Sequence, residues 1–166
     1  MLGRANAQYT IRLAGIDAPE HNQAFGRRSK QNLSRLVFGQ NVTLDCGKEE
    51  SFGRLVCKVM VPNRPGGWRD ACLEQVRDGM AWHYKQFQDE QNPSDRKLYA
   101  DAEDAAREAH TGLWSDAHPI PPWDFRHGTT SPLLYDSGGH RIASWSAGPV
   151  VSNPRSHIYE WPGCPY

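Results

Sequence analysis

The stretch TIRLAGIDAPEH, residues 10–21, contains the first strand of the fold and the loop that follows it. Apolar and polar side chains alternate at its start, which predicts a half-buried strand over about residues 8–16 with Arg12 facing away from the core. The strand runs into a short loop that carries Asp17 and Glu20 on either side of a proline. The sequence therefore predicts one corner of the molecule at which an arginine and two carboxylates meet.

The following segments keep regular helix and strand patterns. FGRRSKQNLSRLVFG, residues 25–39, predicts an amphipathic helix with a basic outer face. Two alternating runs joined by a polar connection predict a β-hairpin, and two further helices follow it. The predicted ranges are 42–46 and 54–61 for the strands, 70–78 for the shorter helix, and Ser94 to just before Gly112 for the longer one, with Leu98, Ala102, Ala105 and Ala109 facing inward.

Composition sets broad limits on what the chain can be. With 166 residues, 38% of them hydrophobic, it is expected to form one domain plus extensions. A formal net charge of zero excludes an overall positive field, so any contact with nucleic acid has to be local. No window approaches the run of about 18 apolar residues that a membrane helix needs, which predicts a soluble chain without a membrane partner.

The amino-acid composition of the sequence changes after about residue 115. Residues 116–149 are rich in Pro, Gly and Ser and are expected to be a linker or tail. Residues 150–166 regain aromatic side chains but are too short to build a core of their own. The predicted organisation is a folded domain over residues 1–115, the linker, and a short C-terminal segment of unknown function.

Five motifs occur in one order along the chain: RLAGIDAPE, AFGRRSKQNL, SFGRLVCKV, LEQVRDGMAW and AREAHTGLW. In this order they resemble the thermonucleases, the staphylococcal nuclease-like family, over about residues 8–114. The resemblance implies an α+β fold built on an OB barrel of five strands with three helices. It also implies calcium-dependent hydrolysis of phosphodiester bonds, so residues 1–115 are expected to be a nuclease-like OB domain.

The resemblance assigns roles to individual residues of the predicted corner. Arg12 and Arg54 match the family's two catalytic arginines, and Glu20 matches its catalytic glutamate. Asp17 matches a carboxylate that binds one calcium ion, and the backbone carbonyl of Ala18 could add an oxygen where the family often has threonine.

A further family position is occupied by Phe52, where the best-known member has tyrosine. Phenylalanine keeps a ring for packing against the substrate but removes a hydroxyl donor. We therefore expect Phe52 to contact substrate, with weaker positioning than a tyrosine would provide.

The residue types at this corner fit the chemistry of phosphodiester cleavage. A phosphate under attack gathers negative charge, so a site needs fixed positive groups, a metal ion and a group that positions water. A guanidinium can donate two parallel hydrogen bonds to phosphate. Ordinary structural interpretations also exist: a solvated strand arginine for Arg12, a turn residue for Asp17, a helix cap for Glu20. We favour catalysis because Arg54 and these three match the family in register.

One part of the family pattern is missing from the sequence. Family members place a Gly-Asp-Thr turn in a hairpin before the strand that carries Arg12, and its aspartate is another calcium ligand. Only three barrel strands are visible here, whereas a closed OB barrel needs five. We therefore expect an N-terminally truncated domain that lacks the first hairpin, binds calcium poorly and could self-associate through an open barrel edge.

The four cysteines lack the CxxC pairing of zinc ribbons, so no structural zinc site is expected. Cys46 and Cys57 occupy facing positions of the predicted hairpin, where they could form a disulfide or remain two buried thiols. Cys72 is expected in the core. A disulfide would favour an oxidising compartment, in keeping with a family whose bacterial members are commonly exported, although residues 1–8 show no signal-peptide pattern.

The predicted function is a calcium-dependent nuclease that acts on single-stranded or frayed DNA and RNA. The alternative is a non-catalytic OB-type module that binds nucleic acid, or an inactive fragment of such a nuclease. Retention of both arginines and the glutamate favours the enzyme. The preference for DNA or RNA, and for internal or terminal cleavage, stays open.

Overall fold

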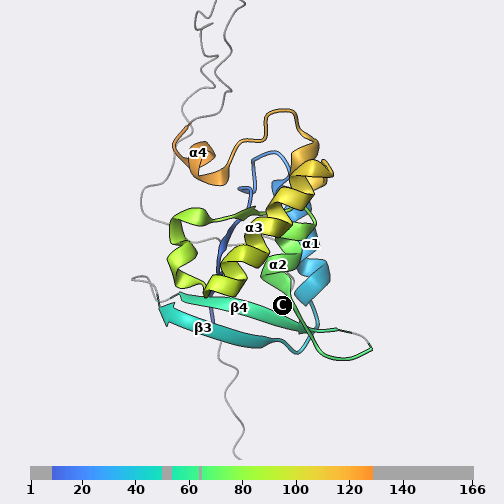
Figure 1. Cartoon of the computed structure of the whole chain (residues 1–166), viewed down its shortest axis with the longest axis vertical. Coiled ribbons are helices and arrows are strands. Elements are labelled where there is room, and N and C mark those ends of the chain that lie inside the picture. Colours follow the sequence, from blue (N-terminus) through green and yellow to red (C-terminus); the bar gives the residue numbers. More distant parts are fainter. Residues whose placement is uncertain (1–8, 50–53, 64, 129–166) are drawn as a thin grey trace, which may run out of the picture.

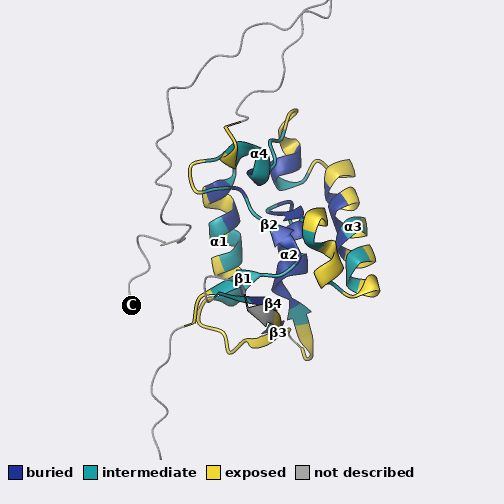
Figure 2. Cartoon of the chain, turned by 90° about the vertical axis from the view of Figure 1, so that its left-hand side faces the viewer, coloured by how far each residue is buried: buried dark blue, intermediate teal, exposed yellow. Residues whose placement is uncertain are grey.

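The computed structural model of the chain describes residues 9–49, 54–63 and 65–128 (Figure 1). Its strands form two small sheets, and helices α1, α2 and α3 lie above the β3–β4 hairpin in both views (Figures 1 and 2). This confirms the α+β class. The strands are β1 Ile11–Leu13, β2 Ile16–Asp17, β3 Thr43–Glu49, β4 Leu55–Pro62, β5 Trp68–Asp70 and β6 Trp82–His83. The helices are α1 Gly26–Val37, α2 Ala71–Arg77, α3 Pro93–Glu108 and α4 Pro122–Arg126, with short 3-10 turns η1 Lys85–Glu90 and η2 Gly112–Ser115.

The single strand predicted over about residues 8–16 is two strands in the structure. Gly15 has a φ of 73°, a left-handed conformation that glycine adopts without strain, and it turns the chain between β1 and β2. As a result, β1 pairs in parallel with β4, while β2 pairs with β6 in the second sheet. The one-strand prediction was wrong because alternation alone does not reveal a change of partner.

The predicted hairpin is confirmed, with β3 and β4 antiparallel and joined to β1 in the order β1–β4–β3. β5 pairs with the end of β4 and completes this four-stranded sheet. In the register, Cys46 lies opposite Cys57, and the two form a disulfide. The disulfide decides between the two alternatives left open by the sequence.

The helices bury one face each against the sheet and against each other. Asp70 is the N-cap of α2 and Asn92 the N-cap of α3, and each accepts backbone N–H groups of the first turn. α2 lies at the centre, in contact with α1, α3 and β4, and Cys72 on it is fully buried, as predicted. The side chains packed in this main core are Ile16, Leu36, Val59, Val61, Ala71, Cys72, Leu73, Val76, Ala81, Tyr99 and Ala102.

The inward stripe of α3 differs from the prediction. Leu98 is 42% exposed, whereas Tyr99 is buried beside it, and the buried stripe continues through Ala102 to Ala106. Figure 2 shows the outward face of α3 as largely exposed. The helix turns Tyr99 inward because its hydroxyl donates to Asp70 at 2.7 Å, an interaction that spacing of apolar residues cannot predict.

Ordered structure extends past residue 115, where the sequence predicted the domain to end. Pro122 is buried, and Trp123 of α4 packs on a second cluster formed by Trp82, Trp114 and their neighbours. α4 lies at the end of the domain far from the β3–β4 hairpin (Figures 1 and 2). The rest of the predicted linker and the segment 150–166 lie outside the described residues. Within the described ranges, no helix is long and apolar enough to cross a membrane.

Candidate active site

The predicted acids lie where β2 ends and the chain enters the loop before α1. Asp17 is the last residue of β2, Pro19 is buried, and Glu20 begins the turn. The Glu20 N–H donates to Gln23 Oε1 at 3.0 Å, which holds the loop closed on itself. Gly26 opens α1 against the Glu20 carbonyl, and a β-carbon there would collide with that oxygen. Backbone packing therefore places both carboxylates on one side of the loop.

Both carboxylates contact one guanidinium, that of Arg126. Its Nη2 donates to Asp17 Oδ2 at 2.6 Å. Its Nη1 donates to Asp17 Oδ1 at 3.2 Å and to Glu20 Oε1 at 2.8 Å. The two carboxylate side chains are each 15% exposed, and that of Arg126 is 32% exposed. The structure thus brings Asp17 and Glu20 together around a single positive charge at the edge of the domain.

The surroundings of Asp17 shift the pKa of its carboxyl. Burial raises the pKa of its carboxyl above the ordinary value, and this outweighs the hydrogen bonds and charge of Arg126, which lower it. The negative charge of Glu20 adds to the rise, and the charge of Arg12 opposes it. A carboxylate in this setting is stabilised by any cation placed against it.

Arg12 lies over two aromatic rings, and its charge acts on Asp17. Its guanidinium carbon is 5.8 Å from the ring centre of Tyr84 and 5.1 Å from that of Phe87. Tyr84 directly follows β6, and its N–H donates to Gly15 O at 2.9 Å, which ties it to the turn before β2. Cation–π contacts of this kind restrict the orientation of a guanidinium.

Arg54 is related to Arg12 by strand register. β1 and β4 are parallel with Arg12 opposite Val56, and the Leu55 N–H donates to Thr10 O at 3.2 Å. Side chains alternate along a strand, so Arg54, two residues before Val56, is expected on the same face of the sheet as Arg12. The β1–β4 pairing therefore relates Arg12 on β1 to Arg54, which directly precedes β4, although 42 positions separate them.

The remaining predicted positions are Ala18 and Phe52. Ala18 is half-buried and packs against the main core, with its backbone between the two acids. Phe52 lies outside the described residues. Its expected contact with substrate stays a prediction.

The donor set at Asp17 and Glu20 fits a hard divalent cation in part. Two carboxylates reach the same nitrogen of Arg126, so they already converge on one positive centre, and carboxylate oxygens are the ligands that calcium prefers. Among residues 9–49, 54–63 and 65–128, no three His, Cys, Asp or Glu side chains are grouped to hold a metal ion. An ion held here would need further oxygens from the backbone, from water or from a phosphate.

Sequence reasoning missed three residues of this region: Arg126, Tyr84 and Trp123. The indole of Trp123 stacks on Tyr84, with ring centres 5.4 Å apart and planes 18° from parallel. Gln23 Nε2 donates to Ile120 O at 2.6 Å and ties the acid loop to the chain leading into α4. The only signal for α4 in the sequence is the short run PWDFR within a proline-rich segment, which does not indicate where it packs.

Comparison with known proteins finds relatives over most of the described chain. The family model described as staphylococcal nuclease homologue matches residues 10–116. An uncharacterized endonuclease of Haemophilus influenzae is 36% identical over 135 residues, which are 81% of this chain and 70% of that protein. A micrococcal nuclease of Shigella flexneri is 38% identical over 120 residues, covering 70% of this chain and 67% of the relative. A probable staphylococcal-like nuclease of Oryza sativa is 34% identical and covers 72% of this chain but 29% of the plant protein.

Proposed function

The chain belongs to the family of staphylococcal nuclease homologues, and we propose that it is a nuclease that hydrolyses phosphodiester bonds of DNA, RNA or both. The observation that carries the proposal is the convergence of Asp17 and Glu20 on one positive group. The charge of Arg12 acts on Asp17, and β1–β4 pairing relates Arg12 to Arg54. Relatives named as nucleases cover most of this chain and support the same activity.

In the proposed reaction, water attacks phosphorus, its oxygen forms the new P–O bond, and the bond to the leaving sugar oxygen breaks. Glu20 orients the water and accepts its proton, and the leaving oxygen takes up a proton in turn. Arg12 and Arg54 donate N–H groups to the phosphate oxygens, on which negative charge grows. The aromatic contacts of Arg12 support this role because they hold the guanidinium in place before substrate arrives.

We also propose that the acid pair binds calcium. Asp17 would hold the ion together with the backbone carbonyl of Ala18, and Glu20 would lie beside it. When bound, the ion would supply positive charge to the phosphate under attack. The convergence of two carboxylates supports the proposal, and the small number of acidic ligands in the described residues supports weak binding.

An OB-type barrel is the fold that we propose for the domain. The parallel β1–β4 pair, the β3–β4 hairpin and the helices that cover them support it. A closed OB barrel has five strands, and in the described residues the strands divide between two sheets. The missing first hairpin, and self-association through an open edge, stay predictions.

A second candidate is a module that binds single-stranded nucleic acid without cutting it. The observation in its favour is that Arg126 pairs with both acids of the site. Arg12, Tyr84 and Phe87 would then offer a positive charge and ring faces to a strand, as single-strand binding proteins do.

Cleavage of labelled single-stranded DNA and RNA, in calcium or in chelator, separates the two candidates. Calcium-dependent cutting that falls about a hundredfold or more in Glu20→Gln and in Arg54→Ala would support the enzyme. Arg77→Ala is the matched control, because it removes the same charge from an exposed pair with Glu74 on α2. Equal cutting by all variants would refute the assigned roles. Binding that persists in chelator without any cutting would favour the module.

A further inference from the structure

Arg126 is held at the acid pair by a packed element. Pro122 at the start of α4 is buried, and the ring of Trp123 stacks on Tyr84 and lies 5.6 Å edge-on from Trp82. The hydrogen bond from Gln23 to Ile120 O fixes the chain just before α4. The whole element lies beyond residue 116, where the family match ends.

The geometry points to a specific role for this element. We propose that Arg126 is an internal counter-ion that occupies the cation position of Asp17 and Glu20, and that a divalent cation has to displace it before the site can load. The inference rests on the proposed function, in which the same acids hold calcium. It adds that a segment beyond residues 10–116, which the family model matches, controls how readily they do so.

The contacts of Arg126 show why its guanidinium and a divalent cation cannot occupy the acid pair at the same time. Three hydrogen bonds from Arg126 use both oxygens of Asp17 and one oxygen of Glu20. These carboxylate oxygens are the ones that a hard cation would need. A guanidinium among them repels an approaching divalent ion and blocks its ligands.

Displacement of Arg126 is physically accessible. Its side chain is 32% exposed, and Arg126 is the last residue of a helix of five residues, so the guanidinium can move into solvent on its flexible stem. Without Arg126, the two carboxylates would lose the positive charge that both of them contact, which favours uptake of a divalent ion.

α4 also covers the aromatic face next to the acids. Trp123 lies on one side of Tyr84, and the guanidinium of Arg12 lies over the same tyrosine ring. A nucleic-acid base that approached this face of Tyr84 would be blocked by Trp123, just as Arg126 blocks a cation that approaches the acids. The same short helix therefore covers the acid pair and its neighbouring ring together.

Calcium binding to the full chain, measured by isothermal titration calorimetry without nucleic acid, tests the inference. Arg126→Gln is expected to bind calcium roughly tenfold more tightly than the unchanged chain. Arg77→Gln, which loses an exposed arginine paired with Glu74, is expected to match the unchanged chain. Unchanged or weaker affinity in Arg126→Gln, or no calcium binding by either protein, would overturn it. Circular dichroism verifies that the variants fold.

Hydrogen exchange on the unchanged chain gives a second test that needs no variant. Saturating calcium is expected to speed amide exchange in the peptide that covers residues 122–128, because Arg126 no longer anchors it. Slower or unchanged exchange in calcium would contradict the displacement.

A cleavage assay keeps this inference distinct from the proposed function. Tighter calcium binding by Arg126→Gln without any cleavage would refute the proposed nuclease activity and support the counter-ion role of Arg126. Calcium-dependent cleavage, with equal calcium affinities in Arg126→Gln and the unchanged chain, would support the nuclease and refute the counter-ion role.

Discussion

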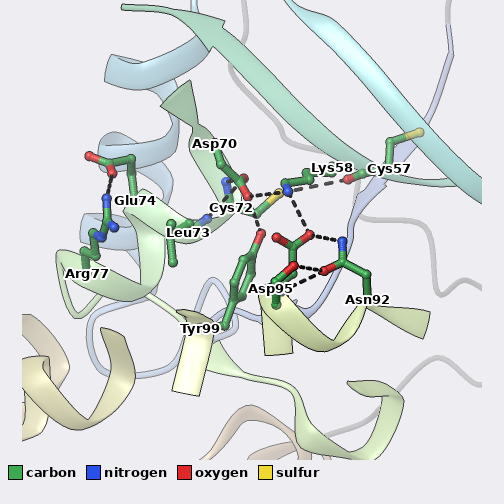
Figure 3. A network of polar contacts seen from close by, with 11 residues as sticks. Cys57, Lys58, Asp70, Cys72, Leu73, Glu74, Arg77, Asn92, Asp95 and Tyr99 are labelled. Carbon is green, nitrogen blue, oxygen red and sulfur yellow. Dashed lines mark hydrogen bonds and ion pairs between the residues drawn. The ribbon is translucent and has the colours of Figure 1, made fainter. Parts of the chain in front are cut away.

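The carboxylate of Asp70 joins a strand to two helices, and its removal offers a quantitative test of the packing (Figure 3). Oδ1 accepts from the N–H groups of Cys72 at 2.9 Å and Leu73 at 3.2 Å, which caps α2. Oδ2 accepts from Tyr99 Oη at 2.7 Å, and Lys58 Nζ lies 3.5 Å away. Asp70 itself is buried at 9% exposure. We expect Asp70→Ala to destabilise the domain through two separable losses.

The magnitude follows from these contacts. Loss of a helix N-cap costs about 1 kcal/mol. Tyr99 is 1% exposed, so its hydroxyl would be left without a partner away from water, at about 1–3 kcal/mol. Lys58 would still pair with Asp95 at 2.8 Å, so losing the Lys58–Asp70 ion pair should cost little. Asp70→Ala should therefore lower the free energy of unfolding by about 2–4 kcal/mol, and Tyr99→Phe, which removes the donor and leaves the cap, by about 1 kcal/mol.

Urea unfolding of the two single variants and the double variant forms a cycle that measures the coupling. The double variant has no stranded hydroxyl, so its loss should be about 1 kcal/mol or more below the sum of the single losses. Asp101→Ala is the control, because this exposed carboxylate pairs only across the surface with Lys97 and should cost less than about 0.5 kcal/mol. A loss below about 1 kcal/mol in Asp70→Ala, or strict additivity, would refute the reasoning.

Four further outcomes are expected. Reduction of the Cys46–Cys57 disulfide, which closes a loop with a sequence separation of 11, should lower the free energy of unfolding by about 3 kcal/mol, measured by urea titration with and without reductant. Burial, with the negative charge of Asp70, raises the pKa of Cys72 to about 12, so iodoacetamide at pH 8.5 should label this thiol in unfolded but not in folded protein, as mass spectrometry would show. Above pH 9.0, the ordinary pKa of the thiol, Cys72 loses its proton in the unfolded state but keeps it in the folded state. The free energy of unfolding should therefore fall as pH rises above 9, by at most about 1.4 kcal/mol per pH unit. Cys72→Ala should flatten this slope. Asn92→Ala should lower the free energy of unfolding by about 1 kcal/mol by removing the cap of α3, whereas Asn92→Ser should retain most of that stability, as urea titration of both variants would show.

The sequence was most informative where structure depends on local pattern. The amphipathic helix read from FGRRSKQNLSRLVFG is α1, and the hairpin and both later helices lie within a few residues of their predicted ranges. Alternation and helical spacing are properties of neighbouring residues, so they can be read without knowing the fold. The family motifs extended this to the acid loop, whose members Asp17 and Glu20 do lie on one side.

Local sequence pattern was insufficient where contacts with residues far along the chain decide the position of a residue. The turn at Gly15 separates β1 from β2 because each strand has a different partner, β4 or β6. The buried stripe of α3 includes Tyr99 instead of Leu98 because Asp70 accepts its hydroxyl. Both choices depend on elements far along the chain.

The acids could be assigned from sequence because Asp17 and Glu20 are three positions apart in a recognisable motif. Their cation could not, because Arg126 lies 109 and 106 positions away in a segment that looks like a linker. Its place depends on Trp123 packing against Tyr84 and Trp82, and that packing exists only once the sheet and helices have formed a surface to receive α4. Covalent proximity determined which acids meet, and tertiary packing decided which charge they meet.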